Sequence, residues 1–349
     1  MKKAETNTPI TLKQIALKVG VSNIAVGHVL LGSGKKTVRV SEKTAERIRQ
    51  VAAEMNYRPN LIARQLAGKG SNIIGVVIDT CAPEIHFKLL SEMERLAGLK
   101  NYRFMVGQTH NDISKINQYR EDFASRGVDG IICMAHQDPD RGHEVFAAYS
   151  SFKNVVFIGK PLLDNNDSYY VSSDYREGMS KAVDHLCTQK CKRIGLLLLS
   201  TRTKAMEFRL EGFELGLKNH GFEKKHDLVE YIGLPGQISI KSLEPYILRL
   251  VHDHSVDGIL ACNDMIAAMA VRILQTNGLK VPEQVRVIGY DNVDWAGLFN
   301  PGITTLDQNY MQMSKLAIEL LWAQINNQKI ERKQRCVMVP PTLVVRQSA

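Results

Sequence analysis

The chain has 349 residues, of which 44% are hydrophobic and 23% are charged, as in ordinary globular proteins. It is long enough to form two or three domains. No apolar run reaches the roughly 18 residues that a membrane helix needs, and the lysines near the first residue precede no apolar segment typical of a secretory signal. These features exclude a membrane-spanning protein and predict a cytoplasmic one.

The six cysteines are scattered along the chain, mostly within apolar runs. They form no CxxC motif, and no histidine lies near them at the spacing of a zinc finger. We therefore expect buried free thiols rather than a disulfide framework. The sequence predicts no metal and no cofactor.

The net charge of +9 is concentrated at one end of the chain. Residues 1–70 contain 13 Lys and Arg against 4 Asp and Glu, whereas the remaining residues are neutral overall. A basic module attached to a neutral body is typical of a protein that binds a polyanion. The alternative is a charged end that only aids solubility.

Residues 11–31 predict two short helices joined by a tight turn. Thr11 and Gln14 have the spacing of a capping box at the start of the first helix. Gly20 permits a sharp turn, and Ser22 caps the second helix. In a helix-turn-helix the second helix lies in the major groove of DNA. Three side chains are expected to face outward there: Asn23, Ile24 and His28. Thr11 and Ser22 are also expected to contact DNA.

A third helix is predicted to start at Ser41 and to run through Met55, ending before the stretch NYRPN, where Pro59 disfavours a helical residue at Arg58. The connection between the second and third helices, residues 32–40, is long and basic. It is either a flexible loop or a source of phosphate contacts. The second interpretation assigns those contacts to three residues: Lys35, Lys36 and Arg39.

Residues 60–68 are compatible with one more helix, but a helix this short is marginal in water. Its apolar face contains Leu61, Ile62 and Leu66. A leucine beside arginines can wedge between base steps in the minor groove and kink the duplex. The alternative is an ordinary interdomain linker with a hydrophobic anchor.

From Ser71 onward, apolar strands alternate with helical patterns, which predicts parallel sheets covered on both faces. We expect strands at residues 72–78, 103–108, 129–134, 154–159, 193–199, 228–233, 257–262 and 285–290. The stretch GVDGIIC at 127–133 returns as SVDGILAC at 255–262. Two similar α/β halves are therefore predicted, with a ligand cleft at the carboxyl ends of their strands.

The chain resembles the LacI/GalR family of bacterial repressors over almost its entire length. The resemblance is carried by the helix-turn-helix, by RPNLIARQLAGKGS followed by IIGVV, and by FRLEGF, ACNDMIAAMAV, VRVIGYDN, PGITTL and PPTLVVRQS. It implies a homodimeric transcription factor on palindromic operator DNA, with a periplasmic-binding-protein-like core of two Rossmann-like subdomains. The core would bind a small effector, commonly a sugar. The domains implied are a helix-turn-helix at 1–58, a hinge helix at 59–70 and a core at 71–349.

The resemblance also implies site residues. Asn23 and Ile24 match the positions that choose the operator sequence, where asparagine can bind adenine and isoleucine can touch a thymine methyl. Leu66 matches the hinge leucine that enters the minor groove. Three more positions surround that leucine: Asn60, Ala63 and Arg64. Ala25, Gly27 and His28 replace the usual Thr, Ser and Arg, so the operator sequence cannot be copied from relatives.

In the core the resemblance assigns effector contacts to Arg209, Asn263 and Asp291. Ordinary structural roles for them are a salt-bridged helix arginine, a turn cap and a strand-end loop residue. The stretch at 79–87 lacks the family's frequent Asn-Pro-Phe-Phe pattern, so the sequence leaves the first wall of the effector cleft undefined.

Two other classes of protein are weighed against a regulator. A solute-binding protein would use the cleft without specific DNA recognition, but the basic module and the lack of a signal sequence argue against it. An enzyme is not predicted, because the chain has no GxSxG, Walker, GxGxxG or HExxH motif. The expected mechanism is allosteric: the effector alters the orientation of the core halves and thereby operator affinity. Inducer, corepressor and activator roles all fit the sequence.

Overall fold

The structure is a computed structural model. It describes residues 10–31, 39–57, 70–79, 82–110, 112, 114–135, 142–150, 152–162, 168–222 and 228–349. The chain divides into two compact units, one of residues 1–73 and 124–129 and one of residues 74–123 and 130–349. Among the described residues, no single helix is long and apolar enough to cross a membrane, and only the first two helices together, bent by 113°, reach that length and composition.

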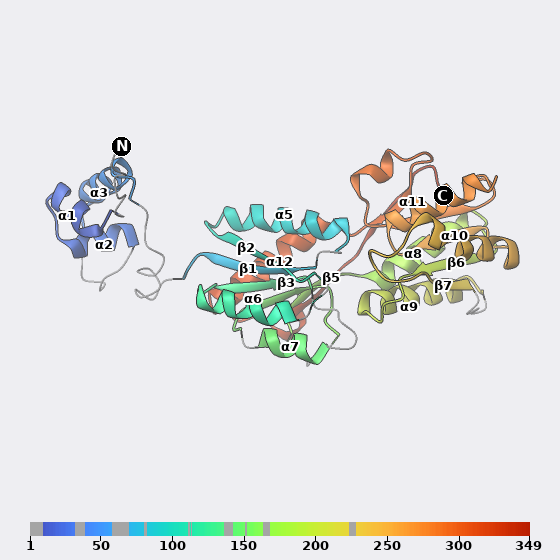
Figure 1. The fold of residues 1–349 in the computed structure, drawn as a ribbon, viewed down its shortest axis with the longest axis horizontal. Helices are drawn as coiled ribbons and strands as arrows, with labels where there is room; N and C mark the ends of the chain where they lie inside the picture. The colour runs from blue at the N-terminus through green and yellow to red at the C-terminus, as the bar shows by residue number, and fades with distance from the viewer. Residues whose placement is uncertain are drawn as a thin grey trace, which may run out of the picture. The chain divides into compact units, whose positions relative to one another are not determined.

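The first unit contains three helices: α1 (Leu12–Val19), α2 (Asn23–Leu31) and α3 (Glu42–Glu54) (Figure 1). The Thr11 side chain and Gln14 form the predicted capping box of α1. Gly20 ends α1 in the left-handed conformation, with φ of 79°, where a residue with a Cβ would be strained. The Ser22 hydroxyl accepts a hydrogen bond of 3.1 Å from the backbone of Ala25. The predicted helix-turn-helix is therefore confirmed.

A small hydrophobic core joins the three helices. Ile15, Val26 and Ile48 each come from a different helix and are fully buried. Burial of one such side chain stabilises the folded state by about 1.5–3 kcal/mol. Since α2 contributes Val26 to this core, its opposite face is free to meet a partner.

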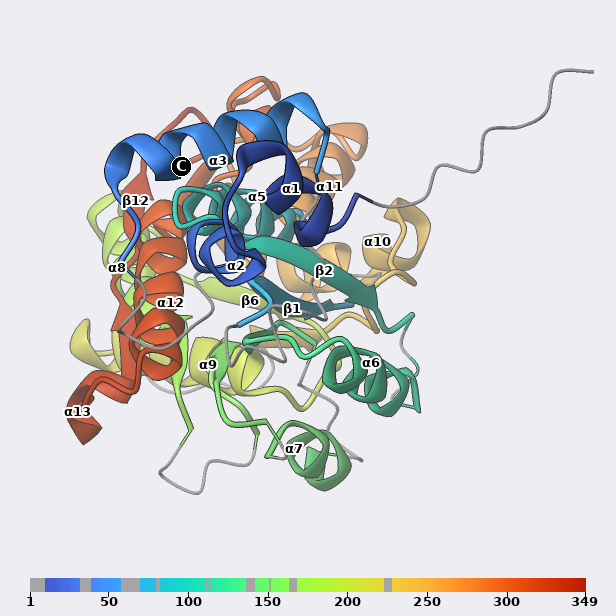
Figure 2. The same ribbon diagram turned by 90° about the vertical axis from the view of Figure 1, so that its left-hand side faces the viewer.

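The second unit contains two six-stranded sheets (Figure 1). The first has the order β11-β5-β4-β3-β1-β2. Its strands are β1 (Ile73–Ile78), β2 (Arg103–Gln108), β3 (Gly130–Cys133), β4 (Val155–Ile158), β5 (Tyr170–Ser173) and β11 (Cys336–Val339). Helices α5 (Glu84–Gly98) and α12 (Tyr310–Ile325) pack together on one face of this sheet, and α6 (Ser114–Ser125) and α7 (Gly142–Ser150) lie on the other (Figures 1 and 2).

The second sheet has the order β12-β10-β9-β8-β6-β7. Its strands are β6 (Ile194–Leu198), β7 (Val229–Tyr231), β8 (Gly258–Ala261), β9 (Arg286–Tyr290), β10 (Thr304–Asp307) and β12 (Thr342–Val344). Helix α8 (Tyr175–Thr188) packs against α9 (Lys204–Asn219), and α10 (Ile240–Leu248) packs against α11 (Asp264–Thr276). A π-helical turn at Arg249–Asp253, a 3-10 helix η3 at Asp294–Gly297 and a short helix α13 at Arg332–Arg335 complete the described elements.

The predicted internal repeat is visible in the strand pairing. The strand β3 pairs with β1 and β4, and β8 pairs in the same way with β6 and β9, all in parallel. In both halves the aspartate before the middle strand accepts hydrogen bonds from backbone N–H groups of the two residues that precede the neighbouring strand. Asp129 accepts from Ser71 and Asn72 at 2.9 and 2.8 Å, and Asp257 accepts from residues 192 and 193 at 2.9–3.0 Å.

All eight predicted strands are present, but four further strands were missed: β5, β10, β11 and β12. They are three or four residues long: β5 and β10 each contain two Ser or Thr residues, whereas β11 (CVMV) and β12 (TLV) are apolar but too short to stand out in the sequence. Each lies next to a segment that passes between the sheets. We call these segments, residues 173–175, 307–310 and 339–342, the three crossovers.

The three crossovers are hydrogen-bonded to one another. The backbone N–H of Asp174 in the first crossover donates to the carbonyl of Val339 in the third, at 2.8 Å. The Asn309 side chain in the second crossover donates to the carbonyl of Pro340 in the third, at 2.7 Å. The two subdomains are therefore joined by one bonded bundle of segments rather than by independent linkers.

Candidate DNA-contacting helix and effector cavity

The start of α2 presents its side chains to solvent. Asn23 is exposed, and 64% of Ile24 is accessible although the side chain is apolar. Thr11 and Ser22 are exposed too, but their hydroxyls already serve the helix caps. His28 is half-buried, and its Nδ1 has no hydrogen-bond partner in the described part of the chain. An exposed isoleucine next to an asparagine at a helix start suits contact with base edges.

The remaining predicted DNA contacts divide between described and undescribed residues. Arg39 is described and exposed. Six of the predicted residues lie outside the described ranges: Lys35, Lys36, Asn60, Ala63, Arg64 and Leu66. Their roles stay predictions.

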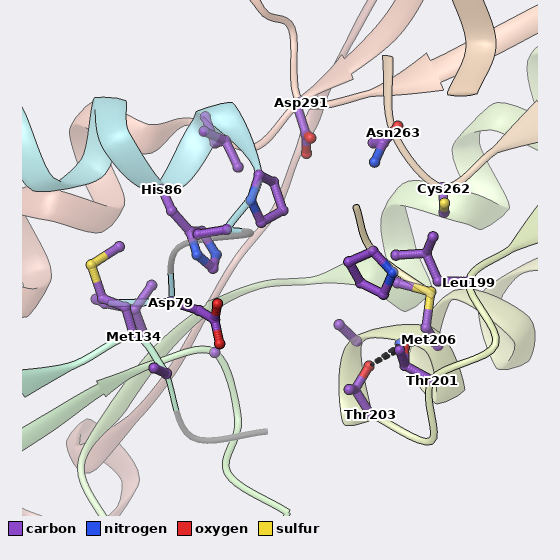
Figure 3. Close-up of a pocket in the computed structure, with 18 of the residues that line it drawn as sticks. Asp79, His86, Met134, Leu199, Thr201, Thr203, Met206, Cys262, Asn263 and Asp291 are labelled. Atoms are coloured by element: carbon purple, nitrogen blue, oxygen red, sulfur yellow. Dashed lines mark hydrogen bonds between the residues drawn. The ribbon is translucent and has the colours of Figure 1, made fainter. Parts of the chain in front are cut away.

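A cavity of about 590 Å³ lies at the carboxyl ends of the strands and is lined by both subdomains. Figure 3 shows Asp79 and His86 on the side of the first sheet and Leu199 and Cys262 on the side of the second. A cavity of this size holds a small molecule with a few polar groups. Arg209, Asn263 and Asp291, which the sequence proposes as effector contacts, all line it.

Arg209 projects from α9 and is only 5% exposed. Its guanidinium carbon lies 4.0 Å from the ring centre of Tyr175 and 4.6 Å from that of Tyr290. One N–H donates to the carbonyl of Ala205 at 3.2 Å, while Nε has no partner among the described residues. No ion pair holds Arg209 within the described chain, so the salt-bridged role does not apply. A buried cation with an unsatisfied N–H favours an acceptor supplied by a ligand.

Asp291 follows β9 with φ of 115°, a conformation that side chains rarely adopt. Its carboxyl is buried and accepts a hydrogen bond of 2.5 Å from the Gln308 amide. Burial, aided by the nearby Asp264 carboxyl, raises the pKa of Asp291 to about 8. At neutral pH the group is therefore mainly protonated and able to donate a hydrogen bond to a ligand hydroxyl.

Asn263 has a structural role as well as a place in the cavity wall. Its side-chain oxygen accepts from the backbone N–H of Ile266 at 2.9 Å and so caps α11. The amide nitrogen is a second polar group on the same side chain, and it can serve a ligand while the oxygen serves the helix. Capping fixes the orientation of this amide before a ligand arrives.

The first-subdomain wall contains polar residues that the sequence analysis did not identify. Asp79 follows β1 and accepts a hydrogen bond of 3.1 Å from the Thr109 hydroxyl. Asp112 accepts a hydrogen bond of 2.9 Å from the backbone N–H of Ser114, the first residue of α6, and His86 projects from α5. The position of Asp79 at a strand end was the available signal. The rest of this wall is aliphatic: Ile85, Leu89, Ile116, Met134, Val145, Ile158 and Met313.

The described cysteines are free thiols, and Cys81 lies outside the described residues. Burial raises the pKa of the Cys133 thiol to about 12 and that of the Cys262 thiol to about 11, so neither is a thiolate at neutral pH. Within the described ranges, no group of three or more His, Cys, Asp or Glu side chains is placed to hold a metal ion.

Two family profiles match parts of this sequence. Residues 11–60 match the profile described as bacterial regulatory proteins, lacI family. Residues 183–349 match the profile described as a periplasmic binding protein-like domain. The first match contains the helix-turn-helix, and the second contains Arg209, Asn263 and Asp291.

Individual proteins resemble the chain over nearly its full length. The HTH-type transcriptional repressor PurR of Histophilus somni (strain 129Pt) is 26% identical over 97% of this chain and 98% of its own. The lac repressor dimer, solved bound to operator and the anti-inducer ONPF, superposes with a TM-score of 0.81 at 23% identity, over 98% of this chain and 99% of that one.

A further solved structure resembles the core. It is a periplasmic binding protein/LacI transcriptional regulator from Alkaliphilus metalliredigens QYMF complexed with D-xylulofuranose. It is 26% identical, with a TM-score of 0.65, and the match covers 79% of this chain and 98% of that one.

Proposed function

We propose that the chain, whose residues 11–60 match the profile of the lacI family of bacterial regulatory proteins, represses transcription as a homodimer on a palindromic operator, under the control of a carbohydrate effector. It is a DNA-binding regulator modulated by a small molecule. The proposal is carried by the combination of an exposed surface at the start of α2 with a ligand-sized cavity that holds a buried arginine whose Nε has no partner among the described residues.

The DNA-binding part of the proposal rests on charge and exposure. Residues 1–70 hold the entire excess of positive charge, which attracts the phosphate backbone. Asn23 and Ile24 stand at the exposed start of α2, the part of a recognition helix that reaches base edges. The relatives named PurR are repressors, and the lac repressor structure is a dimer on its operator, which supports a repressor that binds DNA as a dimer.

The effector part of the proposal rests on the two walls of the cavity. Arg209, Asn263 and Asp291 supply hydrogen-bonding groups on one side, and aliphatic side chains line much of the other. A carbohydrate has hydroxyls for the first wall and C–H surface for the second. The relative solved with D-xylulofuranose supports this class of ligand. Because the curated relatives are repressors, we expect the ligand to be bound and released unchanged.

In this proposal the effector has different affinities for two orientations of the core subdomains, and DNA affinity differs between the same two orientations. Coupling of this kind is reciprocal, so operator DNA changes effector affinity by the same factor. The hinge residues, with Leu66 at their centre, would carry the change to the DNA.

Selection of genomic fragments tests the DNA-binding part. The full-length chain should enrich a palindrome whose retention falls steeply with salt, because counterions are released on binding, whereas a fragment starting at Ser71 should not enrich it. Ile24→Ala should weaken binding to the enriched fragment by about tenfold. Leu17→Ala is the matched control, since Leu17 is also an exposed apolar residue but lies on α1. Enrichment without a shared motif would contradict sequence-specific repression.

The fluorescence of a native tryptophan, Trp295, provides a test of the effector part of the proposal. The chain has two tryptophans, and Trp295 of η3 donates a hydrogen bond of 2.8 Å to Glu84 of α5, across the subdomains. With Trp322→Phe as background, a panel of aldoses and ketoses can be screened by Trp295 emission. Arg209→Ala should abolish the response to a positive sugar, and Arg272→Ala, an exposed arginine on α11, should preserve it. An unchanged response in Arg209→Ala would contradict the assigned site.

A further inference from the structure

The guanidinium of Arg209 stacks on the rings of two tyrosines, whose hydroxyls form hydrogen bonds with residues of the crossovers. Tyr290 ends β9 and is completely buried, although a tyrosine normally keeps its hydroxyl near water. Its hydroxyl shares a hydrogen bond of 2.9 Å with the hydroxyl of Ser173. Ser173 is also completely buried, and it opens the first crossover at the end of β5. The ring beneath the arginine is therefore tied to a segment that joins the subdomains.

The second tyrosine reaches the second crossover. Tyr175 closes the first crossover and begins α8, and its hydroxyl donates to the Gln308 side chain at 3.4 Å. Gln308 in turn donates to Asp291, which lines the cavity. The two tyrosine rings lie 5.5 Å apart and are tilted by 45°, so they form one contiguous surface under the guanidinium of Arg209.

The third crossover lies close to Tyr290, and both approach a glycine on α8. A Cβ built at Gly178 would lie 2.7 Å from Cγ of Pro341 and 2.8 Å from the hydroxyl oxygen of Tyr290. Only glycine lets α8, the third crossover and the tyrosine hydroxyl approach this closely. Residues of all three crossovers therefore surround the two rings on which the arginine rests.

We propose that Tyr290 is a positioning residue that connects the effector contact of Arg209 to the crossovers, with its hydrogen bond to Ser173 as the connecting element. A ligand that engages Arg209 has to share the guanidinium with the two rings. Any shift of the Tyr290 ring moves the hydroxyl that Ser173 holds. The inference rests on the proposed function of the cavity and adds the route by which occupancy changes the orientation of the subdomains.

The experiment uses the full-length chain with Trp322→Phe, so that Trp295 reports the contact between the subdomains. Tyr290→Phe removes the hydroxyl but keeps the ring under Arg209, and Ser173→Ala removes the same hydrogen bond from the other end. Tyr119→Phe is the matched control, because its hydroxyl donates at 3.0 Å to a carbonyl within the first subdomain, that of Gln108. Trp295 emission and affinity for the selected DNA fragment are measured without ligand.

Tyr290→Phe and Ser173→Ala should both shift Trp295 emission, and both should change DNA affinity by about fivefold or more, the factor associated with one buried hydrogen bond. The double variant should go no further than either single variant, because one bond is removed in all three. Tyr119→Phe should leave emission and DNA affinity unchanged even where it lowers thermal stability. The inference is overturned if emission stays the same in Tyr290→Phe, or if Tyr119→Phe reproduces its effects.

A second variant approaches the same contact from α8. Gly178→Ala pushes on both Pro341 and the Tyr290 hydroxyl, so it should shift Trp295 emission at least as far as Tyr290→Phe does. An unchanged emission spectrum in a folded Gly178→Ala protein would also overturn the inference. Failure of the proposed function can be told apart from failure of this inference. If the proposed function is wrong, the unmodified full-length chain enriches no DNA motif, whereas the emission shifts that test the inference are measured without DNA.

Discussion

The two halves of the core share a strand order and differ in what equivalent positions carry. Strand β4 pairs with β3 in the first half as β9 pairs with β8 in the second. When β3 is matched to β8, these registers make Ile158 equivalent to Tyr290 and Gly159 equivalent to Asp291. Each residue of these pairs ends a strand or directly follows one. In the first half the positions are apolar or lack a side chain, and in the second they hold the ring under Arg209 and the buried carboxyl.

The neighbouring strands β3 and β8 differ in the same way at the residues that follow them. The repeat aligns Ala135 of the first half with Asn263 of the second, and both line the cavity. The backbone thus builds the same rim twice, but the polar side chains differ: the second half holds Asn263 and Asp291 at these positions, whereas at the ends of β1 and β6 the first half holds Asp79 and the second holds Leu199. This distribution suits a ligand that binds polar groups of both halves, so that its occupancy depends on how the halves are oriented.

The largest expected effect tests whether the two halves are packed equally tightly. Gly75 of β1 and Gly195 of β6 occupy equivalent positions. A Cβ on Gly75 would lie 2.6 Å from the Phe123 ring, whereas one on Gly195 would lie 3.2 Å from Leu250. Gly75→Ala should therefore cost about 3 kcal/mol of unfolding free energy and Gly195→Ala about 1 kcal/mol, measured by urea denaturation. Equal losses would contradict the difference in packing.

The next effect tests what the halves share. Asp129 and Asp257 each accept backbone hydrogen bonds at the start of the neighbouring strand. Replacement of either by alanine leaves those N–H groups without a charged acceptor and should cost about 2 kcal/mol in each half. Asn at the same position retains one acceptor oxygen and should recover part of the loss. A large loss in only one half would break the structural equivalence.

A pH profile sharpens the contrast between Gly159 and Asp291. The pKa of Asp291 is raised to about 8 in the folded chain, against about 3.9 for an unfolded aspartate. The folded state holds the proton more strongly, so stability falls as the pH rises from about 4 to about 8. The Asp291→Asn variant has no proton to lose at this position, so its stability should fall less over this range. The difference between the two falls in unfolding free energy should exceed about 1 kcal/mol. Parallel denaturation profiles for the two proteins would refute a protonated Asp291.

The smallest effect on stability concerns the contact between the halves. Lys88 of α5 and Asp294 of η3 form an ion pair of 2.7 Å, but the aspartate side chain is 90% exposed. Lys88→Met should therefore change the unfolding free energy by less than about 1 kcal/mol. It should still shift Trp295 emission, because Trp295 and its partner Glu84 lie on the same two elements. A large destabilisation would show that the ion pair is stronger than its exposure indicates.

The sequence predicted most of the secondary structure because those signals are local. The capping box at Thr11, the turn at Gly20 and the long apolar strands each depend on neighbouring residues. The four missed strands are short, and one of them, β5, pairs with β11, which lies more than a hundred residues away in the sequence. Among the candidate effector residues, Arg209 was matched through the resemblance, whereas His86 was missed because the stretch at 79–87 departs from the family pattern.

By itself the sequence determined a basic helix-turn-helix, a repeated α/β core and the identity of the polar residues at the strand ends. Only the tertiary structure decided that Arg209 stacks on two tyrosines, that Asp291 is buried enough to raise its pKa, and that Tyr290 bonds to Ser173. The physical reason is distance along the chain. Caps and strands follow from contacts between near neighbours, whereas desolvation, ring stacking and the crossovers arise only when segments remote in sequence are packed together.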